Sequence, residues 1–401
     1  MLSPIPLERF AASVRGTSSE FLPPEAYTSP SFYEFELGAI WRKEWLAVGR
    51  LEEIPNVGDY FSVTVGQEPI TVVRASEGEI VALSPICRHR GMLVAEGSGN
   101  CRGAFVCRYH SWSYDLRGEL RGAPQMAGRE DFDRRRYSLP RLRVELWRGI
   151  IFINFDEQAG PLAPRLKKLD ELVNDWHIEA LQSEAVRDPS FKSMIDHAWN
   201  WKVYTEGQSE CYHCDKLHAS TPIMKALDFS TMSLDLDDPD GGTWAIGLRS
   251  RDIDPTINQF GKAILPPIAT LSDEQRRINY AVNLAPNVFM ALMADSVMLV
   301  SWMPLGPRSM RVKRHRLYPQ STLAMPDFVE IHGTERSAVR EFVGQDEYAL
   351  ERVQIGLSSI FAPRGPVAPN EPILAAFNKW LVDRYQRADV QARAMNGSGA
   401  A

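Results

Sequence analysis

The sequence is poor in cysteine, in charge of one sign and in long apolar runs. Its five cysteines among 401 residues are too few for a disulfide framework and are typical of a reducing compartment. Lysine and arginine number 45 against 51 acidic residues, and this net charge of −6 does not favour binding to nucleic acid or an anionic membrane. No segment has the about 18 apolar residues that a membrane span requires, and Met1–Pro6 does not resemble a signal sequence. We therefore expect a cytoplasmic protein with no nucleic-acid or membrane partner.

The residue pattern changes along the chain in a way that predicts two domains. Between Trp45 and Leu83, short runs rich in β-branched residues alternate with Gly and Asn turns, which is typical of a small all-β domain. After a polar linker, helical and strand-like segments mix in an α+β pattern with an antiparallel sheet, and two helices, Met325–Ile355 and Glu371–Arg387, close the chain. The predicted segments are an N-terminal arm and helix over 1–42, the all-β domain over 43–156, the larger domain over 157–390 and a flexible tail over 391–401.

Two short motifs inside the predicted all-β domain carry metal-binding residues. Cys87 and His89 form one Cys-x-His pair, and Cys107 and His110 form one Cys-x-x-His pair, with several glycines in the segments around and between them. Two thiolates and two imidazoles suit an iron-sulfur cluster in which His replaces Cys on one iron. The same four side chains could also hold a structural zinc ion.

A second group of chemically active residues lies in a segment predicted to be helical from about His197 to Asp215. Glu210 and His213 are three residues apart and face the same way on a helix. His218 is five residues beyond His213, about 140° around an ideal helix. The helix must therefore break or bend after His213 if both imidazoles are to reach one metal ion. Two His and one carboxylate are the ligands with which non-heme Fe(II) enzymes activate O2.

Two cysteines in the same segment allow other interpretations. Cys211 and Cys214 could form a redox pair or, with a neighbouring His, a zinc site. Because no thioredoxin-like βαβ pattern surrounds them, we expect them to be packing thiols.

The two motifs together resemble the α subunits of Rieske non-heme iron oxygenases, the terminal oxygenase components. The resemblance rests on the Cys-x-His and Cys-x-x-His pairs, on Asn-Trp-Lys and Glu-Cys-Tyr-His-Cys from Asn200 onward, and on Asp346 to Leu357 near the C-terminus. It implies a Rieske [2Fe-2S] domain followed by a helix-grip type catalytic domain. It also implies that Cys87 and Cys107 hold one iron of the cluster while His89 and His110 hold the other.

The resemblance further implies that His213, His218 and Asp346 hold a mononuclear Fe(II). Glu347 is the alternative carboxylate if Asp346 is not a ligand. Glu210 would link an iron histidine to a cluster histidine of the adjacent subunit in a homotrimer. Glu at this position resembles the branch that oxidises quaternary ammonium compounds such as carnitine, glycine betaine and choline. Many relatives carry Asn where this chain has Gly207.

The implied activity uses O2 and electrons from an NAD(P)H reductase carrying flavin and an iron-sulfur cluster, possibly through a ferredoxin. The oxygenase would hydroxylate a C–H bond and so remove an N-methyl group from a quaternary ammonium substrate. The alternatives are hydroxylation or cis-dihydroxylation of an aromatic acid and, less favoured, a non-catalytic electron carrier. Side chains that could line the substrate cavity are Trp244, Tyr280, Phe289 and Trp302, with Arg249 or Arg251 for a carboxylate.

Overall fold

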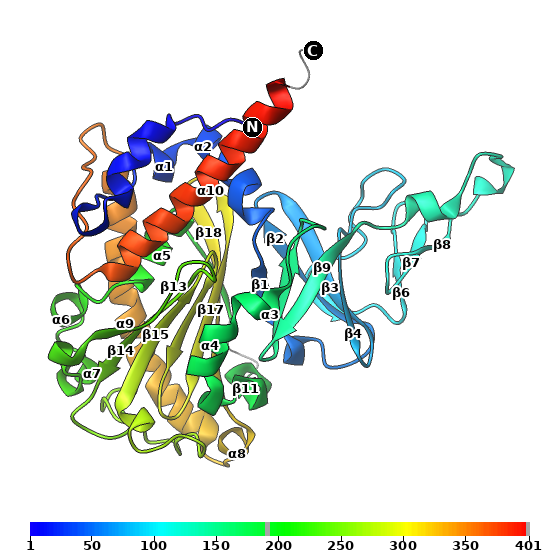
Figure 1. The fold of residues 1–401 in the computed structure, drawn as a ribbon. Coiled ribbons are helices and arrows are strands. Elements are labelled where there is room, and N and C mark those ends of the chain that lie inside the picture. Colours follow the sequence, from blue (N-terminus) through cyan, green and yellow to red (C-terminus); the bar gives the residue numbers. More distant parts are fainter. Residues whose placement is uncertain (189–192, 398–401) are drawn as a thin grey trace. The chain divides into compact units, whose positions relative to one another are not determined.

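The computed structural model describes residues 1–188 and 193–397, which fall into two compact units (Figure 1). The smaller unit is Arg42–Pro161, and the larger one combines Met1–Trp41 with Leu162–Ala401. These divisions at 41/42 and 161/162 lie close to the boundaries predicted at 42/43 and 156/157.

The smaller unit is built from β-strands, as its β-branched runs predicted. Seven strands form an antiparallel sheet in the order β1-β10-β9-β4-β3-β2-β5, and β6-β7-β8 form a second, small sheet. Buried side chains between these strands, among them Val73, Val81 and Phe105, form a core that also contains Cys87 and Cys107. The strands are β1 Leu46–Arg50, β2 Asp59–Val65, β3 Glu68–Ser76, β4 Glu79–Leu83, β5 Ser98–Asn100, β6 Ala104–Val106, β7 Ser113–Asp115, β8 Leu120–Gly122, β9 Arg141–Trp147 and β10 Ile150–Asn154.

The larger unit contains an antiparallel sheet with helices packed on it. In the described residues its strand order is β11-β18-β17-β16-β15-β14-β13, with β12 also paired to β18. The strands are β11 Leu181–Ser183, β12 Met194–His197, β13 Ser233–Asp238, β14 Thr243–Arg249, β15 Ile278–Leu284, β16 Val288–Leu292, β17 Val297–Gly306 and β18 Ser309–Pro319. The α+β class with an antiparallel sheet is thereby confirmed.

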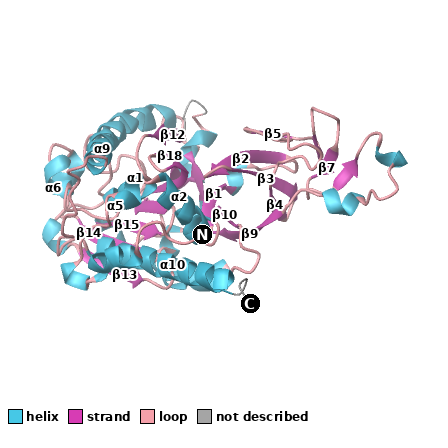
Figure 2. Ribbon diagram, turned by 90° about the horizontal axis from the view of Figure 1, so that it is seen from above, coloured by secondary structure: helices cyan, strands magenta, loops and turns pink. Residues whose placement is uncertain are grey.

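The helices of the larger unit come from both ends and the middle of the sequence. They are α1 Glu25–Thr28, α2 Pro30–Glu36, α3 Leu162–Arg165, α4 Lys167–Leu172, α5 Trp201–Gln208, α6 Cys214–Leu217, α7 Pro222–Ala226, α8 Gln320–Leu323, α9 Phe328–Leu357 and α10 Pro372–Gly397. Helix α5 packs against α9 and β17, and Figure 2 shows α5 between the two long helices α9 and α10. In the part of the chain that the structure describes, no helix has the length and apolar character to span a membrane.

Two predicted helix boundaries are wrong. The helix predicted from about His197 to Asp215 begins at Trp201, where the Asn200 side chain caps it by accepting from the Lys202 amide, and it ends at Gln208. The chain therefore breaks before His213 rather than after it. Helix α10 runs on to Gly397, so residues 391–397 are helical and not a flexible tail, while 398–401 lie outside the described residues.

Candidate cluster loops and candidate iron site

The two metal-binding motifs of the smaller unit form two loops of the same design. In each loop the cysteine amide donates to the carbonyl five residues on, and the cysteine carbonyl accepts from the amide four residues on. The residue four positions after each cysteine has a positive φ, 77° at Gly91 and 56° at Ser111. The four hydrogen bonds are Cys87 N to Met92 O (2.9 Å), Gly91 N to Cys87 O (3.0 Å), Cys107 N to Trp112 O (2.8 Å) and Ser111 N to Cys107 O (2.9 Å).

These loops bury the sulfur ligands and expose the nitrogen ligands. Cys87 and Cys107 are 3% and 2% exposed, while His89 and His110 are exposed with ring centroids 4.7 Å apart. The Tyr114 hydroxyl lies 3.4 Å from Cys87 Sγ. Two soft thiolates inside and two imidazoles outside fit a cluster with sulfur on the inner iron and nitrogen on the outer iron.

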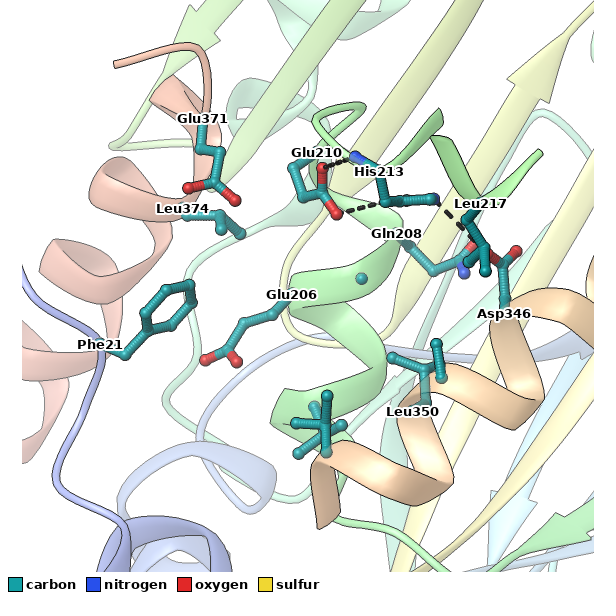
Figure 3. Close-up of a pocket in the computed structure, with 14 residues that line it drawn as sticks. Phe21, Glu206, Gln208, Glu210, His213, Leu217, Asp346, Leu350, Glu371 and Leu374 are labelled. Atoms are coloured by element: carbon teal, nitrogen blue, oxygen red, sulfur yellow. Dashed lines mark hydrogen bonds and ion pairs between the residues drawn. The ribbon is translucent and has the colours of Figure 1, made fainter. Parts of the chain in front are cut away.

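Three residues of the larger unit converge to form the candidate iron site. His213 lies in the break before α6, His218 directly follows α6, and Asp346 lies on α9. One ligand atom from each lies within 4.8 Å of the others. Asp346 Oδ1 is 2.8 Å from His218 Nε2 and 3.4 Å from His213 Nε2, as Figure 3 shows for His213. This geometry fits a facial set of two imidazoles and one carboxylate.

The electrostatics of this site favour a cation. Burial acts to lower the pKa of His213, but hydrogen bonds with Asp346 and Glu210 outweigh it and raise the pKa to about 10. Burial acts to raise the pKa of Asp346, yet hydrogen bonds from the two histidines hold the pKa below its usual value. The two carboxylates therefore concentrate negative charge beside the imidazole nitrogens, at a position where a metal ion could bind.

Further residues orient the two imidazoles. Glu210 contacts Nδ1 of His213 within the same chain (Figure 3), and the Phe342 ring stacks on His218 with centroids 3.8 Å apart. Gln345 Oε1 lies 2.7 Å from His218 Nδ1, which directs Nε2 of His218 toward Asp346. The sequence reasoning missed Gln345; its position next to Asp346 was the only available signal. Glu347 points elsewhere, because it forms an ion pair with Arg314 at 3.0 Å.

We expect Gln345→Leu to weaken iron binding by about 10 to 100-fold, since this is the usual cost of losing an outer hydrogen-bond partner of a metal ligand. The measurement is iron retained during titration with a chelator. Glu341→Gln, an exposed change on the same helix, is the control and should retain iron like the wild type. Equal retention by both variants would show that Gln345 does not orient His218.

The two cysteines beside His213 form a disulfide, so the expectation of packing thiols is wrong. The break between α5 and α6 brings the Cα atoms of Cys211 and Cys214 to 4.9 Å, within bonding range. Among the described residues the remaining cysteines, Cys87, Cys101 and Cys107, are free.

A chamber of about 140 Å³ adjoins the candidate iron site, between the sheet and α9. Ala281 lies opposite Ile246 of β14 and Ala291 of β16, so these side chains share one sheet face. The small alanines leave space there, while Phe289 and Phe342 supply aromatic walls. The described lining residues include the carboxylates of Glu210 and Asp346 but no Lys or Arg.

Of the four aromatic residues predicted as cavity candidates, Phe289 is the one whose side chain lies with the chamber-lining alanines. Trp244 and Trp302 are each 1% exposed and pack in the core beside α5, where Trp302 meets Tyr204 edge-on. Tyr280 also lines the chamber, although its side chain alternates to the opposite sheet face from Ala281 and its ring packs on Trp176. Arg249 and Arg251 are exposed and are not lining residues.

Asn279 is a polar residue of the chamber that the sequence reasoning missed. It lies opposite Leu248 on the chamber face of β15, and its buried Nδ2 has no hydrogen-bond partner among the described residues. A buried amide donor without a partner is costly unless a bound molecule satisfies it. Asn279 can therefore donate to an oxygen atom of a substrate.

A second hollow, about 250 Å³, also reaches the candidate iron site, because Glu210, His213 and Asp346 line it together with Glu206, Glu371 and Phe21 (Figure 3). Burial raises the pKa of Glu206 to about 8, so this carboxyl is largely protonated at neutral pH. A Cβ at Gly207 would lie 2.8 Å from Leu350 Cδ2. Leu350 thus occupies the space that a larger side chain at position 207 would need.

Comparisons with known proteins match both units. The ring hydroxylating alpha subunit catalytic domain matches residues 174–387, and the Rieske [2Fe-2S] domain matches residues 44–140. The oxygenase subunit of glycine betaine monooxygenase from Pseudomonas aeruginosa UCBPP-PA14 is 32% identical over 206 residues, 51% of this chain and 46% of that protein. The α subunit of benzene 1,2-dioxygenase from Pseudomonas putida is 31% identical over 223 residues, 55% of this chain and 49% of that protein.

Among solved structures, the quaternary ammonium Rieske monooxygenase CntA with γ-butyrobetaine superposes with a TM-score of 0.76 at 21% identity. The superposition covers 96% of this chain and 100% of that chain, and it shows a shared fold. The sequence matches to the two relatives above span about half the length of those proteins. The cluster loops and the candidate iron site lie inside the two matched domains.

Proposed function

From the premise that the chain belongs to the ring-hydroxylating α-subunit family with a Rieske [2Fe-2S] domain, we propose that it is a terminal oxygenase acting on a quaternary ammonium substrate. In this proposal Cys87, His89, Cys107 and His110 hold the cluster, and His213, His218 and Asp346 hold Fe(II). When bound, the cluster supplies electrons one at a time and the Fe(II) supplies O2 activation. The electrons originate from NAD(P)H through a flavin and iron-sulfur reductase, with or without a ferredoxin.

The observation that carries the proposal is the convergence of His213, His218 and Asp346 beside a chamber. An electron carrier has no need for a second metal site adjoining a cavity with apolar walls. The alternative of a non-catalytic carrier is therefore disfavoured, although its cluster loops would look the same.

The chain's own residues prepare the site for this chemistry. Gln345 and Glu210 each contact a histidine Nδ1, so that both Nε2 atoms are directed toward Asp346. The apolar wall formed by Phe289, Ala281 and Phe342 limits water beside the reacting atoms. These contacts are made by the chain's own side chains, which preorganises the site.

The charges of the chamber support a cationic substrate. Glu210 and Asp346 lie at one end of it, and the aromatic rings of Phe289 and Phe342 can face a quaternary ammonium group. The betaine oxygenase subunit among the relatives is named for such a substrate. Hydroxylation of an N-methyl group by O2, two electrons and two protons gives a carbinolamine and water. The carbinolamine then breaks its C–N bond, releases formaldehyde and the hydroxyl proton, and leaves the demethylated amine with the electron pair on nitrogen.

A second candidate is the oxidation of a neutral aromatic ring, because the apolar chamber would also accept one and a benzene dioxygenase subunit is among the relatives. An aromatic acid fits less well, since the described lining residues offer its carboxylate no Lys or Arg.

The test is substrate-dependent O2 uptake by the holoenzyme with a surrogate reductase, using glycine betaine, carnitine, choline, benzene and benzoate. Formaldehyde equal to the O2 consumed with a quaternary ammonium compound supports the proposal. Dihydrodiol formation from benzene, with no formaldehyde from the ammonium compounds, would select the second candidate. Iron analysis giving two irons per chain and no uptake would leave the electron carrier.

We further propose a homotrimer in the cytoplasm, in which Glu210 of one subunit approaches a cluster histidine of the next. Trimers with electron transfer between subunits are typical of the family. A reductase using NAD(P)H is expected where that nucleotide is found, which supports the cytoplasmic location.

A strongly exposed apolar pair just beyond α9 supports self-association. Ile360 and Phe361 are 93% and 86% exposed, more than any other large apolar residue described. We expect Ile360→Asp together with Phe361→Asp to convert the trimer to monomers, because the two carboxylates would be desolvated in the contact. Light scattering after size exclusion gives the mass. Val390→Asp, an exposed apolar residue on α10, is the control, and an unchanged trimer in the double variant would place the contact elsewhere.

A further inference from the structure

A second cavity, which we call the arginine cavity, borders a different face of α9 from the chamber. Its volume is about 510 Å³, within the range of small-molecule sites. The chamber is lined from α9 by Phe342 and Asp346, whereas the arginine cavity is lined from α9 by Val339, Val343 and Glu347. Strands β12, β17 and β18 provide the opposite wall, so the two cavities have no described lining residue in common.

The arginine cavity takes its name from Arg314, Arg316, Arg336 and Arg340, which differ in how their charge is satisfied. Arg316 is fully engaged with Ser296, Thr256 and the backbone, and it lies 3.4 Å from Glu335 and 3.6 Å from Asp295. Arg314 pairs with Glu347 at 3.0 Å, and Arg336 pairs with Asp188 at 2.5 Å. The charges of these three guanidinium groups are therefore paired with carboxylates of the protein itself.

Arg340 is different, because it is exposed and no ion-pair partner is found for it among the described residues. It lies one helical turn from Arg336, whose own charge is paired with Asp188. The arrangement therefore leaves one guanidinium charge, that of Arg340, uncompensated beside the cavity. An anion placed beside Arg340 would compensate this charge.

The interior of the cavity also contains a histidine and two glutamates, Glu184 and Glu347. His332, which is 2% exposed, also lines it. Burial, followed by the charges of Arg316 and Arg336, lowers the pKa of His332 to about 4. The imidazole is thus neutral at pH 7, and the apolar side chains of Val339, Val343 and Met298 complete a surface on which a hydrocarbon body can lie.

We propose that the arginine cavity binds a small organic monocarboxylate, with its carboxylate held by Arg340 and Arg336 and its apolar body against Val339, Val343 and Met298. A monoanion matches the single uncompensated charge, and the planar guanidinium fork suits a carboxylate. The apolar wall favours a carboxylate with a hydrocarbon chain over inorganic phosphate. This proposal for the arginine cavity does not depend on which substrate the chamber accepts.

Isothermal titration of the iron-loaded full-length protein with hexanoate tests the proposal. Hexanoate should bind at least about ten-fold more tightly than hexanamide or inorganic phosphate, and Arg340→Gln should remove about ten-fold of that affinity. Arg352→Gln is the matched control, because Arg352 is an exposed arginine of α9 that does not line the cavity. It should bind hexanoate like the wild type.

Two further variants show which of the two cavities binds hexanoate. Val339→Phe should fill the arginine cavity and abolish hexanoate binding, while Ala281→Phe fills the chamber and should leave hexanoate binding intact. Absence of hexanoate binding to the wild type, equal binding of hexanoate and hexanamide, or unchanged affinity in Arg340→Gln would overturn the proposal. Loss of binding in Ala281→Phe alone would place hexanoate in the chamber and equally overturn it.

Discussion

Replacing Asp346 with alanine should lower the iron content from about three to about two atoms per chain and abolish substrate-dependent O2 uptake. Among the described residues, Asp346 is the carboxylate that meets both His213 and His218, at 3.4 and 2.8 Å. Loss of an outer partner of a metal ligand already costs about 10 to 100-fold, so loss of the ligand should cost at least about 100-fold. Metal analysis and an oxygen electrode measure the two effects.

The matched control is Glu347→Gln, one residue along the same helix. Glu347 is the alternative ligand considered from the sequence, but the structure pairs it with Arg314. This variant should keep its iron and most of its activity. If Glu347→Gln lost the third iron while Asp346→Ala kept it, the assignment of the carboxylate ligand would be reversed. The visible absorption of the cluster should be the same in both variants.

Replacing Lys202 with methionine should destabilise the larger unit by about 3–5 kcal/mol, since it leaves a buried carboxylate without its partner. Lys202 and Glu36 are each 0% exposed, and Lys202 Nζ lies 2.9 and 2.7 Å from the two carboxylate oxygens of Glu36. The Tyr385 hydroxyl donates to the same carboxylate. Together with Tyr385, the pair thus joins α2, α5 and α10, which are far apart in sequence.

The stability that Lys202→Met loses should depend on pH in a defined direction. Burial raises the pKa of Glu36 above its ordinary 4.5, and removing the Lys202 charge, which opposes that shift, raises the pKa further. A folded-state pKa above the unfolded value means that stability falls as pH rises through that range. The difference between Lys202→Met and wild type should therefore be smaller at pH 5 than at pH 8, as measured by urea unfolding.

Two variants separate the buried charge from other effects. Lys202→Met with Glu36→Gln should recover most of the stability, because a neutral amide replaces the unpaired carboxylate. Lys379→Met breaks the exposed pair with Asp383 and should change stability by no more than about 1 kcal/mol. A loss as large in Lys379→Met as in Lys202→Met would contradict the role of burial.

Much of the candidate site could be predicted because its ligands are close in sequence or belong to a recognisable motif. Cys87 and His89 are two residues apart, and His213 and His218 are five apart, so local spacing alone indicated metal binding. The family resemblance, now confirmed by the domain matches, added Asp346 from a distant helix. Gln345 and Asn279 could not be predicted, because their roles depend on which side chains α9 and β15 bring to the chamber.

The errors have a common physical cause. Continuing the helix from Trp201 through His213 followed local propensity, but the chain breaks after Gln208. There Ser209 Oγ donates to the Thr205 carbonyl and contacts Asn283 of β15, a tertiary contact. The same break brings Cys211 and Cys214 close enough to form a disulfide. Tyr280 and Phe289 are both aromatic lining residues on strands, and strand register decides which of the two side chains shares the sheet face of Ala281.

The sequence by itself indicated the donor atoms of both candidate metal sites, the all-β and α+β character of the two units, and the family. These properties depend on residue type and on short spacings, which the covalent chain carries with it. Only the tertiary structure decided between Asp346 and Glu347 as the carboxylate that meets the histidines, which strand face forms the chamber, and that four arginines line a separate cavity at another face of α9. Such properties arise when distant segments pack together, because packing and burial set the distances and charges that no local pattern contains.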